Sequence, residues 1–278
     1  IAKIYRGSKK KTHGMARYVI KSSTPLLPHS ISSAMSVQAD KLFITSIMGA
    51  SALAKYSVVY SLGIALQFTV SAIGSALSPW IIRRLDAGEE KKICELVLPM
   101  TVGYCALSQC LVAVAPEAML ILAPRDYLDA LPAILPIALS TPFLFISSVA
   151  TVGIVHSGKS RYAMSISLFG AALCIILNYM LIGGFGFVGA GTALLICQGV
   201  TALIGVAFLE KAGLGEMLSL GKIVLTCVVS AFVGLLFYLM RESVALRLFT
   251  LILPGIALLY CLKKAGELVM ETDRKKLP

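Results

Sequence analysis

Residues 162–208 read YAMSISLFGAALCIILNYMLIGGFGFVGAGTALLICQGVTALIGVAF, and no charged side chain interrupts them. A membrane-spanning helix needs about 20 mostly apolar residues, so this stretch is long enough for two helices joined by a short connector. The sequence therefore predicts two spanning helices here, over 162–182 and 188–208.

The composition of the whole chain also indicates a membrane protein. Of the 278 residues, 58% are hydrophobic and 14% are charged, and the mean hydropathy is +0.87. Soluble domains are about 45–50% apolar and about 25% charged, so a soluble enzyme, a disordered chain and a disulfide scaffold are excluded. The net charge of +11 lies on too apolar a chain for a nucleic-acid binder, and we expect the basic residues to flank membrane spans.

Six further runs have the length and composition of a membrane span: 25–48, 56–80, 93–115, 131–155, 222–240 and 243–262. All are much longer than the strands of a membrane β-barrel, and they do not alternate between polar and apolar residues. The predicted fold class is therefore an all-α polytopic membrane protein with eight transmembrane helices. Pro132, Pro136 and Pro142 fall within one predicted span, where prolines either kink the helix for a mechanical role or merely vary its packing.

Basic residues are distributed unevenly between alternate connectors. With the N-terminal segment in the cytoplasm, the outer connectors contain only Lys55, Arg125, Arg241 and Arg247, and nearly all other Lys and Arg residues fall in the inner segments. Membrane proteins keep an excess of basic residues in their cytoplasmic loops. We therefore expect a multi-pass protein of the cytoplasmic membrane, with both ends of this chain in the cytoplasm.

The predicted span 25–48 has a polar face. His29, Ser33, Ser36 and Asp40 recur at helical spacing, within an arc of about 60° at 100° per residue. Because an ionisable group is costly in lipid, we expect this face to line a water-filled cavity. Lys41 is rotated about 100° from the stripe, so it would snorkel outward or pair with another helix, and we include it among the predicted cavity residues. An interhelical ion pair is the alternative for Asp40 and Lys41, and hydrogen-bonded packing is the alternative for His29.

The next span, 56–80, has a polar face without charged residues. Its members are Tyr56, Tyr60, Gly63, Gln67, Ser71, Gly74 and Ser78. The tyrosines and Gln67 favour a hydrophilic lining, whereas the glycines favour close packing against another helix. We predict that Tyr56, Tyr60 and Gln67 line the cavity. Gln109, Asn178 and Gln198 each stand alone in a span, where we expect interhelical hydrogen bonds.

No catalytic or metal-binding constellation is found in the sequence. His13, His29 and His156 are far apart, and the P-loop, GxSxG and HExxH motifs are absent. The seven cysteines fall within apolar runs and form no CxxC pair, so we interpret them as small buried hydrophobic residues. We therefore expect no catalytic site, no metal site and no cofactor.

Several short motifs together resemble one transporter family. They are PLLPH at 25–29, QADK at 38–41, GASALAKYS at 49–57, PW at 79–80, LAPRDY at 122–127, GKS at 158–160, NY at 178–179 and GFVGAG at 186–191. In this order and spacing they resemble bacterial Wzx-type polysaccharide flippases of the multidrug/oligosaccharidyl-lipid/polysaccharide exporter superfamily. The resemblance covers nearly the whole chain.

The resemblance implies a C-terminal portion of a two-lobed transporter. Residues 1–24 would be the cytoplasmic connector between the lobes, 25–208 the six-helix transport lobe, 209–262 two additional transmembrane helices, and 263–278 a basic cytoplasmic tail. Such proteins move undecaprenyl-diphosphate-linked oligosaccharide repeat units across the cytoplasmic membrane by alternating access, for exopolysaccharide or capsule assembly.

The partners implied are the lipid-linked oligosaccharide, membrane lipids, and polysaccharide polymerase and assembly proteins, with no nucleic acid. Transport would be coupled to a proton or sodium gradient. Arg83, Arg84, Lys91 and Lys92 would form a basic entrance that attracts diphosphate, although the same residues also fit the positive-inside signal alone. A drug or cation antiporter using Asp40 is the rival function, and a membrane polysaccharide polymerase or ligase is a weaker one because no large outer loop is present.

Overall fold

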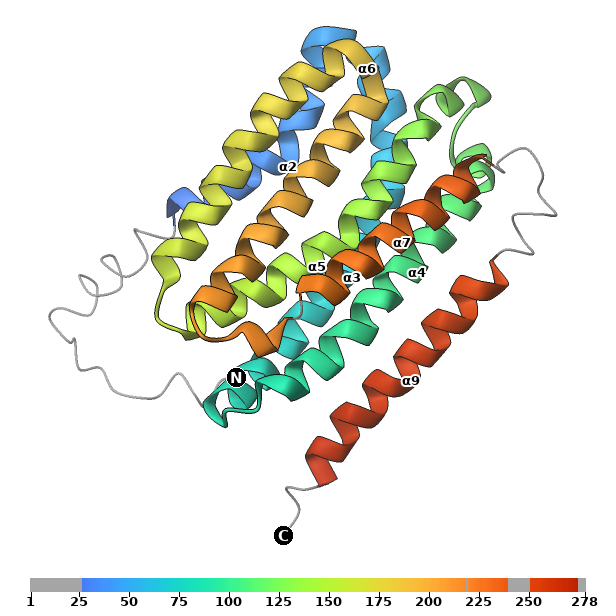
Figure 1. The fold of residues 1–278 in the computed structure, drawn as a ribbon. Helices are drawn as coiled ribbons and strands as arrows, with labels where there is room; N and C mark the ends of the chain where they lie inside the picture. Colours follow the sequence, from blue (N-terminus) through green and yellow to red (C-terminus); the bar gives the residue numbers. More distant parts are fainter. Residues whose placement is uncertain (1–26, 219, 240–250, 275–278) are drawn as a thin grey trace, which may run out of the picture.

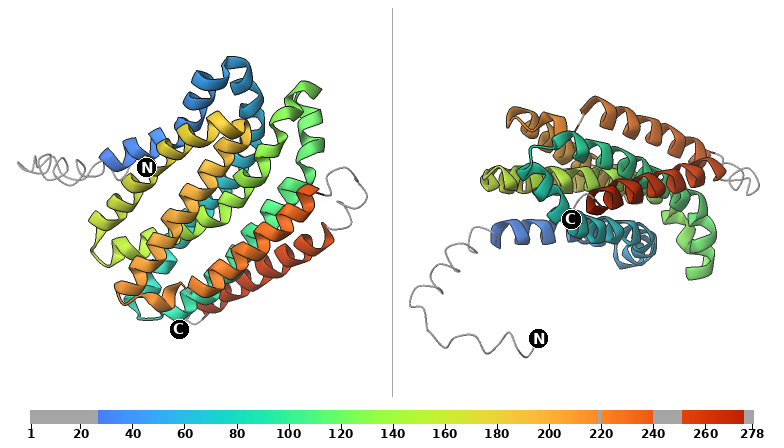
Figure 2. Two further views of the ribbon diagram at one scale, coloured as in Figure 1. Left: turned by 45° about the horizontal axis from the view of Figure 1, so that its top comes forward. Right: turned by 90° about the horizontal axis from the view of Figure 1, so that it is seen from below.

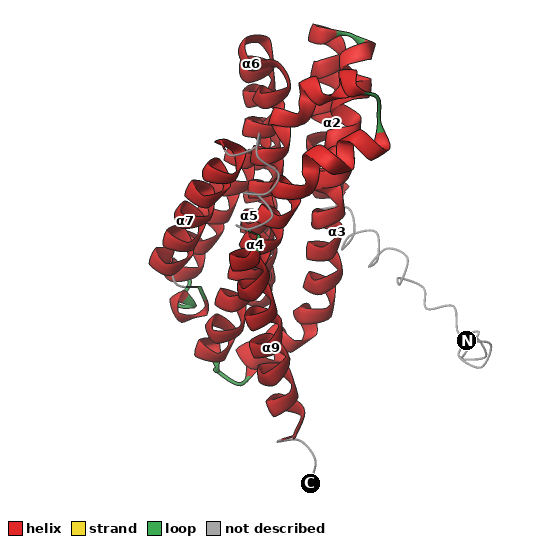
Figure 3. Ribbon diagram, turned by 90° about the vertical axis from the view of Figure 1, so that its right-hand side faces the viewer, coloured by secondary structure: helices red, strands yellow, loops and turns green. Residues whose placement is uncertain are grey.

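The computed structural model describes residues 27–218, 220–239 and 251–274, and every regular element in these ranges is a helix (Figure 1). In chain order they are α2 (Leu27–Met48), α3 (Ala50–Asp86), α4 (Glu90–Leu122), the 3-10 helix η3 (Arg125–Ala133), α5 (Ile134–His156), α6 (Ser160–Lys211), the 3-10 turn η4 (Gly215–Met217), α7 (Leu220–Leu239) and α9 (Ile252–Arg274). Short loops or direct junctions connect the consecutive elements from α2 to η4 (Figure 3). The predicted all-helical class is confirmed.

Several of these helices have the length and composition of membrane spans. The described residues contain five such segments: Ala50–Asp86, Glu90–Leu122, Arg125–His156, Ser160–Lys211 and Gly215–Leu236. The fold is therefore compatible with a multi-pass membrane protein. The predicted spans 25–48 and 243–262 overlap α2 and α9, which are not among the five. In the second case α9 begins only at Ile252, and 240–250 lie outside the described residues.

Helix α6 consists of two antiparallel arms (Figure 1). At Gly186 the backbone has φ 55° and ψ −128°, a conformation that interrupts the helix and that glycine adopts far more readily than other residues. The first arm, 160–185, and the second arm, 187–211, correspond to the predicted spans 162–182 and 188–208. Gly189 makes the close return possible, because a Cβ atom there would overlap the backbone carbonyl of Leu181.

Helix α5 lies in the centre of the bundle, where α3, α4, α6 and α7 all pack against it. Gly63 on α3 faces Ile137, and Gly191 on the second arm of α6 faces Pro136, so neither position has room for a side chain. Small residues of this kind allow helices to pack closely in lipid, where the hydrophobic effect does not drive them together. Helix α2 packs on α3 and α6, and α9 lies at the edge of the bundle against α4 (Figure 2).

The three prolines of the predicted span 131–155 have different structural effects. Pro132 lies inside η3. Pro136 lies in the first turn of α5, where a missing N–H removes no α-helical hydrogen bond. Pro142 is inside α5 and therefore leaves the carbonyl of Ala138 without its helical donor. The Ser108 hydroxyl of α4 lies 2.8 Å from that carbonyl and 2.8 Å from its own Tyr104 carbonyl. The single hydroxyl proton is shared by the two carbonyls, so a neighbouring helix supplies part of the donor that Pro142 removed.

A second polar contact attaches α7 to α4. The Gln109 amide nitrogen donates to the backbone carbonyl of Ser230 at 2.7 Å and to its hydroxyl at 2.9 Å. One turn further along α7, a Cβ atom at Gly234 would lie only 3.0 Å from Oε1 of Gln109. The interhelical hydrogen bond predicted for Gln109 is therefore confirmed.

We expect Ser108→Ala to lower the free energy of unfolding by about 1–3 kcal/mol, because the Ala138 carbonyl is then buried without a donor. Ser140→Ala is the matched control. Its hydroxyl is equally buried and bonds the Ile137 carbonyl at 2.7 Å, which keeps its helical donor. Thermal unfolding in detergent measures both. In a Pro142→Ala background, where the backbone donor is restored, the loss from Ser108→Ala should shrink. An unchanged loss there would contradict this account of Ser108.

Candidate functional site

A cavity of about 260 Å³ lies between α2, α3, α5 and the two arms of α6. Most of its polar wall is uncharged, and the polar lining residues are Asp40, Tyr60, Gln67, Ser147, Thr151, Ser167, Asn178, Gln198 and Thr201. Along the first arm of α6 the lining extends from Ile166 to Asn178, about 18 Å at 1.5 Å per residue. The cavity is therefore a long, partly open space whose wall mixes these polar side chains with apolar ones such as Leu144, Ile166 and Leu194.

The structure places the residues predicted for the cavity in three groups. Asp40, Tyr60 and Gln67 line the cavity wall. Tyr56 and Lys41 lie beside it and contact lining residues. The side chains of His29, Ser33 and Ser36, which belong to α2, lie outside the described part of the structure.

The Asp40 carboxylate is buried, with 6% of its surface exposed. The Tyr56 hydroxyl of α3 donates to its Oδ2 at 2.8 Å, and the backbone N–H of Lys41 donates to its Oδ1 at 2.8 Å. A carboxylate can accept about four hydrogen bonds, so the carboxylate retains capacity for a group in the cavity. Two neutral donors offset part of the cost of burying it in the bundle.

Lys41 is held by an aromatic ring rather than by a carboxylate. Its Nζ lies 4.6 Å from the centroid of the Tyr60 ring, within the range of a cation–π interaction. Neither Asp40 nor Lys41 takes part in the ion pairs found among the described residues. Asp40 and Lys41 thus link α2 to α3 through Tyr56 and Tyr60, and the structure does not place them in the interhelical ion pair considered above.

Asn178 and Gln198 face the cavity, which the sequence did not predict. The Asn178 amide nitrogen donates to the Cys174 carbonyl of its own helix at 2.9 Å, so this bond is not interhelical. Its Oδ1 is buried and has no hydrogen-bond partner among the described residues. A periodic signal was present: 167, 171, 174 and 178 repeat the spacing of 29, 33, 36 and 40. Alanine and cysteine occupy two of these positions, so the stripe is too weakly polar for the sequence alone to predict a cavity face.

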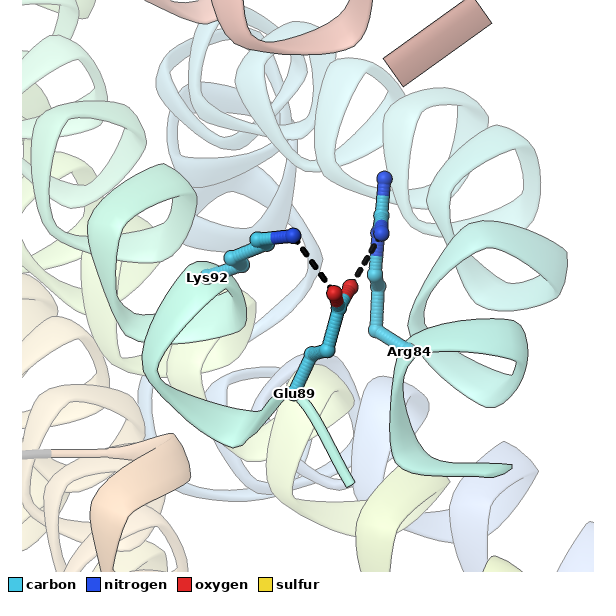
Figure 4. Close-up of polar contacts among 3 residues, drawn as sticks. All are labelled: Arg84, Glu89 and Lys92. Atoms are coloured by element: carbon cyan, nitrogen blue, oxygen red, sulfur yellow. Dashed lines mark hydrogen bonds and ion pairs between the residues drawn. The ribbon is translucent and has the colours of Figure 1, made fainter. Parts of the chain in front are cut away.

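The residues of the predicted basic entrance lie at the end of the bundle where α3 meets α4. Glu89 accepts hydrogen bonds from Lys92, at 2.5 Å, and from Arg84 (Figure 4). These bonds from Lys92 and Arg84 lower the pKa of the Glu89 carboxyl below its usual value. Lys91 forms an exposed pair with Glu216 at 3.5 Å. Of the four predicted cations, only Arg83 has no ion pair within the described ranges.

Two side-chain contacts bring the connectors at this end together. His156 at the end of α5 lies 2.8 Å from Asp86 at the end of α3. The Lys91–Glu216 pair likewise joins α4 to η4. At the opposite end, Lys55 pairs with Asp129 of η3 at 2.6 Å. The connectors assigned to the inner side by their basic residues are thus neighbours in space.

Comparison with known proteins adds no assignment. No protein-family model matches this chain, and no curated protein matches it. The function is therefore inferred from the cavity, its surroundings and the sequence motifs.

Removal of the Tyr56 hydroxyl tests whether the Asp40 contact fastens α2 to α3. We expect Tyr56→Phe to lower the free energy of unfolding by about 1–3 kcal/mol, because a buried carboxylate loses a donor. Tyr179→Phe is the control, since that side chain is 69% exposed. Far-UV circular dichroism during heating in detergent measures both. Equal midpoints for the two variants would show that the bond is dispensable.

Proposed function

We propose that this chain is part of a flippase that moves undecaprenyl-diphosphate-linked oligosaccharide repeat units across the bacterial cytoplasmic membrane by alternating access. The observation that supports it most is the long cavity lined by uncharged hydrogen-bonding groups within a bundle of apolar helices. The motif resemblance points to the same cargo. The product would supply surface polysaccharide assembly, with a polysaccharide polymerase and assembly proteins acting after it.

The chemistry of the cavity wall fits a sugar. Amide side chains such as Gln67, Asn178 and Gln198 both donate and accept hydrogen bonds, as serine and threonine hydroxyls do. Sugar hydroxyl groups need partners of both kinds. The unpartnered Oδ1 of Asn178 is one acceptor available for such a hydroxyl. The Tyr60 ring adds a flat apolar surface against which a sugar ring can pack.

The proposed topology has eight membrane crossings: α2, α3, α4, α5, the two arms of α6, α7 and α9. The neighbouring connectors that contain Arg83, Arg84, Lys91, Lys92, Lys159 and Lys211 would face the cytoplasm. This assignment follows from the positive-inside preference. It also places the basic entrance on the side where the diphosphate-linked cargo is made.

Within that entrance, the structure distinguishes the four basic residues. Glu89 engages Arg84 and Lys92, so these two are partly neutralised. Arg83 and Lys91 are more exposed to solvent than Arg84, and Lys91 forms only a long surface pair. Exposed pairs of this kind contribute about 0–1 kcal/mol. We therefore expect Arg83 and Lys91 to attract the diphosphate more strongly than their two neighbours.

Asp40 is the one charged residue in the described cavity lining, and we propose that it couples transport to a proton or sodium gradient. Intramembrane carboxylates commonly mark ion and proton pathways. The same residue supports the rival function, a drug or cation antiporter, because a buried carboxylate also binds cationic cargo. The two functions differ in what accumulates when the protein is absent.

Deletion of the full-length gene should stop surface polysaccharide assembly while the lipid-linked repeat unit accumulates on the cytoplasmic side. Extraction and mass spectrometry measure the amount of the lipid-linked unit. Lectin binding or glycosidase cleavage of its sugar in inverted vesicles shows whether it lies on the cytoplasmic side. Complete loss of the lipid-linked unit would favour a synthetic enzyme. Intact polymer together with new sensitivity to cationic drugs would favour the antiporter.

Asp40→Asn tests the coupling role. We expect polymer export to fall at least tenfold, while the protein level stays near normal, because the neutral amide keeps the shape but cannot exchange a proton or hold a cation strongly. Asp126→Asn is the control, since that carboxylate is exposed on η3. Normal export by a well-expressed Asp40→Asn protein would remove Asp40 from the coupling site.

A further inference from the structure

Three hydroxyl groups in the lining of the cavity between α2, α3, α5 and α6 have already used their protons. They belong to Thr151 on α5, Ser167 on the first arm of α6 and Thr201 on the second arm. Each donates to the backbone carbonyl four residues earlier in its own helix, at 2.8, 3.1 and 2.9 Å respectively. Because a hydroxyl has one proton and two lone pairs, each of these groups can only accept a hydrogen bond from a molecule in the cavity.

Two further lining groups are also acceptors. The Asp40 carboxylate has no proton to donate, and Oδ1 of Asn178 is buried without a partner among the described residues while its amide nitrogen donates within its own helix. Helix α2 meets the first arm of α6 at this level, since the Phe43 and Tyr179 rings lie 6.2 Å apart. Ser167 and Asn178 are about 16 Å apart along that arm, so acceptors extend along much of the cavity.

The donors and positive charges in the same lining are fewer. The amides of Gln67 and Gln198 can donate, but no lysine, arginine or histidine belongs to the lining in the part of the chain that the structure describes. Lys41 follows Asp40 in sequence, and its Nζ lies against the Tyr60 ring, 4.6 Å from the centroid. The wall is therefore rich in acceptors and includes one carboxylate that no cation pairs with among the described ion pairs.

We propose that this wall selects sugar units that are rich in hydrogen-bond donors, and that it rejects sugars bearing a carboxylate. The inference rests on the proposed flippase function and specifies its cargo. Hydroxyl and amino groups of a sugar can donate to the oxygens of Thr151, Ser167, Thr201 and Asn178. A sugar carboxylate can only accept, so it would leave these oxygens unpaired and would be repelled by the like charge of Asp40.

The test compares two water-soluble probes on the full-length protein in detergent. One is citronellyl diphosphate linked to glucose, and the other is citronellyl diphosphate linked to glucuronic acid. The two sugars differ only in a hydroxymethyl group against a carboxylate, so contacts of the diphosphate with the basic entrance are common to both. Microscale thermophoresis should show the glucose probe binding about tenfold or more tightly than the glucuronic acid probe.

Citronellyl diphosphate without a sugar provides the baseline for these affinities. If both sugar probes bind more tightly than the baseline but equally to each other, the selection is overturned and the flippase proposal stands. If neither sugar probe binds more tightly than the baseline, sugar recognition by the cavity fails, and the proposed function fails with it.

Two substitutions test the wall directly. Thr201→Val keeps the shape but removes an acceptor, and it should weaken binding of the glucose probe about twofold to tenfold. Thr226→Val is the matched control, because that hydroxyl bonds the Lys222 carbonyl at 2.8 Å in the same way but does not line the cavity. Equal affinities of the two valine variants would contradict the proposal.

Gln198→Lys adds a positive charge to the wall and should reverse the preference, so that the glucuronic acid probe binds more tightly. A misfolded protein cannot show such a gain, which makes this result independent of how well the valine variants fold. A Gln198→Lys protein that binds glucuronic acid no better than the unsubstituted protein does would overturn the selection by charge.

Discussion

The hydrogen bond from Ser108 of α4 to the Ala138 carbonyl of α5 is the polar contact that joins α4 to the central helix of the bundle at the level of Pro142. Pro142 removes the helical donor for that carbonyl, and no lipid group can replace it. Helix α4 must therefore stay against α5 at this level. Because α3, α6 and α7 also pack on α5, its position determines where the cavity walls contributed by Ser147 and Thr151 are placed.

The cavity itself results from the way α6 folds back on α5. Gly186 allows the reversal, and Gly170 lets the two arms approach, since a Cβ there would lie 2.5 Å from the Thr201 methyl group. Close contact at these points leaves polar space elsewhere between the arms. The proposed sugar binding by the amides uses this space between the arms.

Few charged side chains line the cavity, because burying a charge is costly. Asp40 is the only charged group lining the described cavity, and its oxygens have two neutral donors. Arg83, Arg84, Lys91 and Lys92 lie at the end of the bundle where α3 meets α4, and Glu89 and Glu216 pair with three of them. A polar cargo would therefore meet positive charge at the entrance and mostly neutral groups inside.

The sequence alone determined the helical class, the two arms of α6 and the helix faces on which Asp40, Tyr60 and Gln67 lie, because length, hydropathy and helical periodicity are local properties. Only the tertiary structure decided that Tyr56 bonds Asp40, that Lys41 lies on Tyr60, and that Asn178 and Gln198 face the cavity. It also decided the pairing of Ser108 with the carbonyl freed by Pro142. These contacts join helices far apart in sequence, and a periodic pattern gives the face of a helix but not its neighbour.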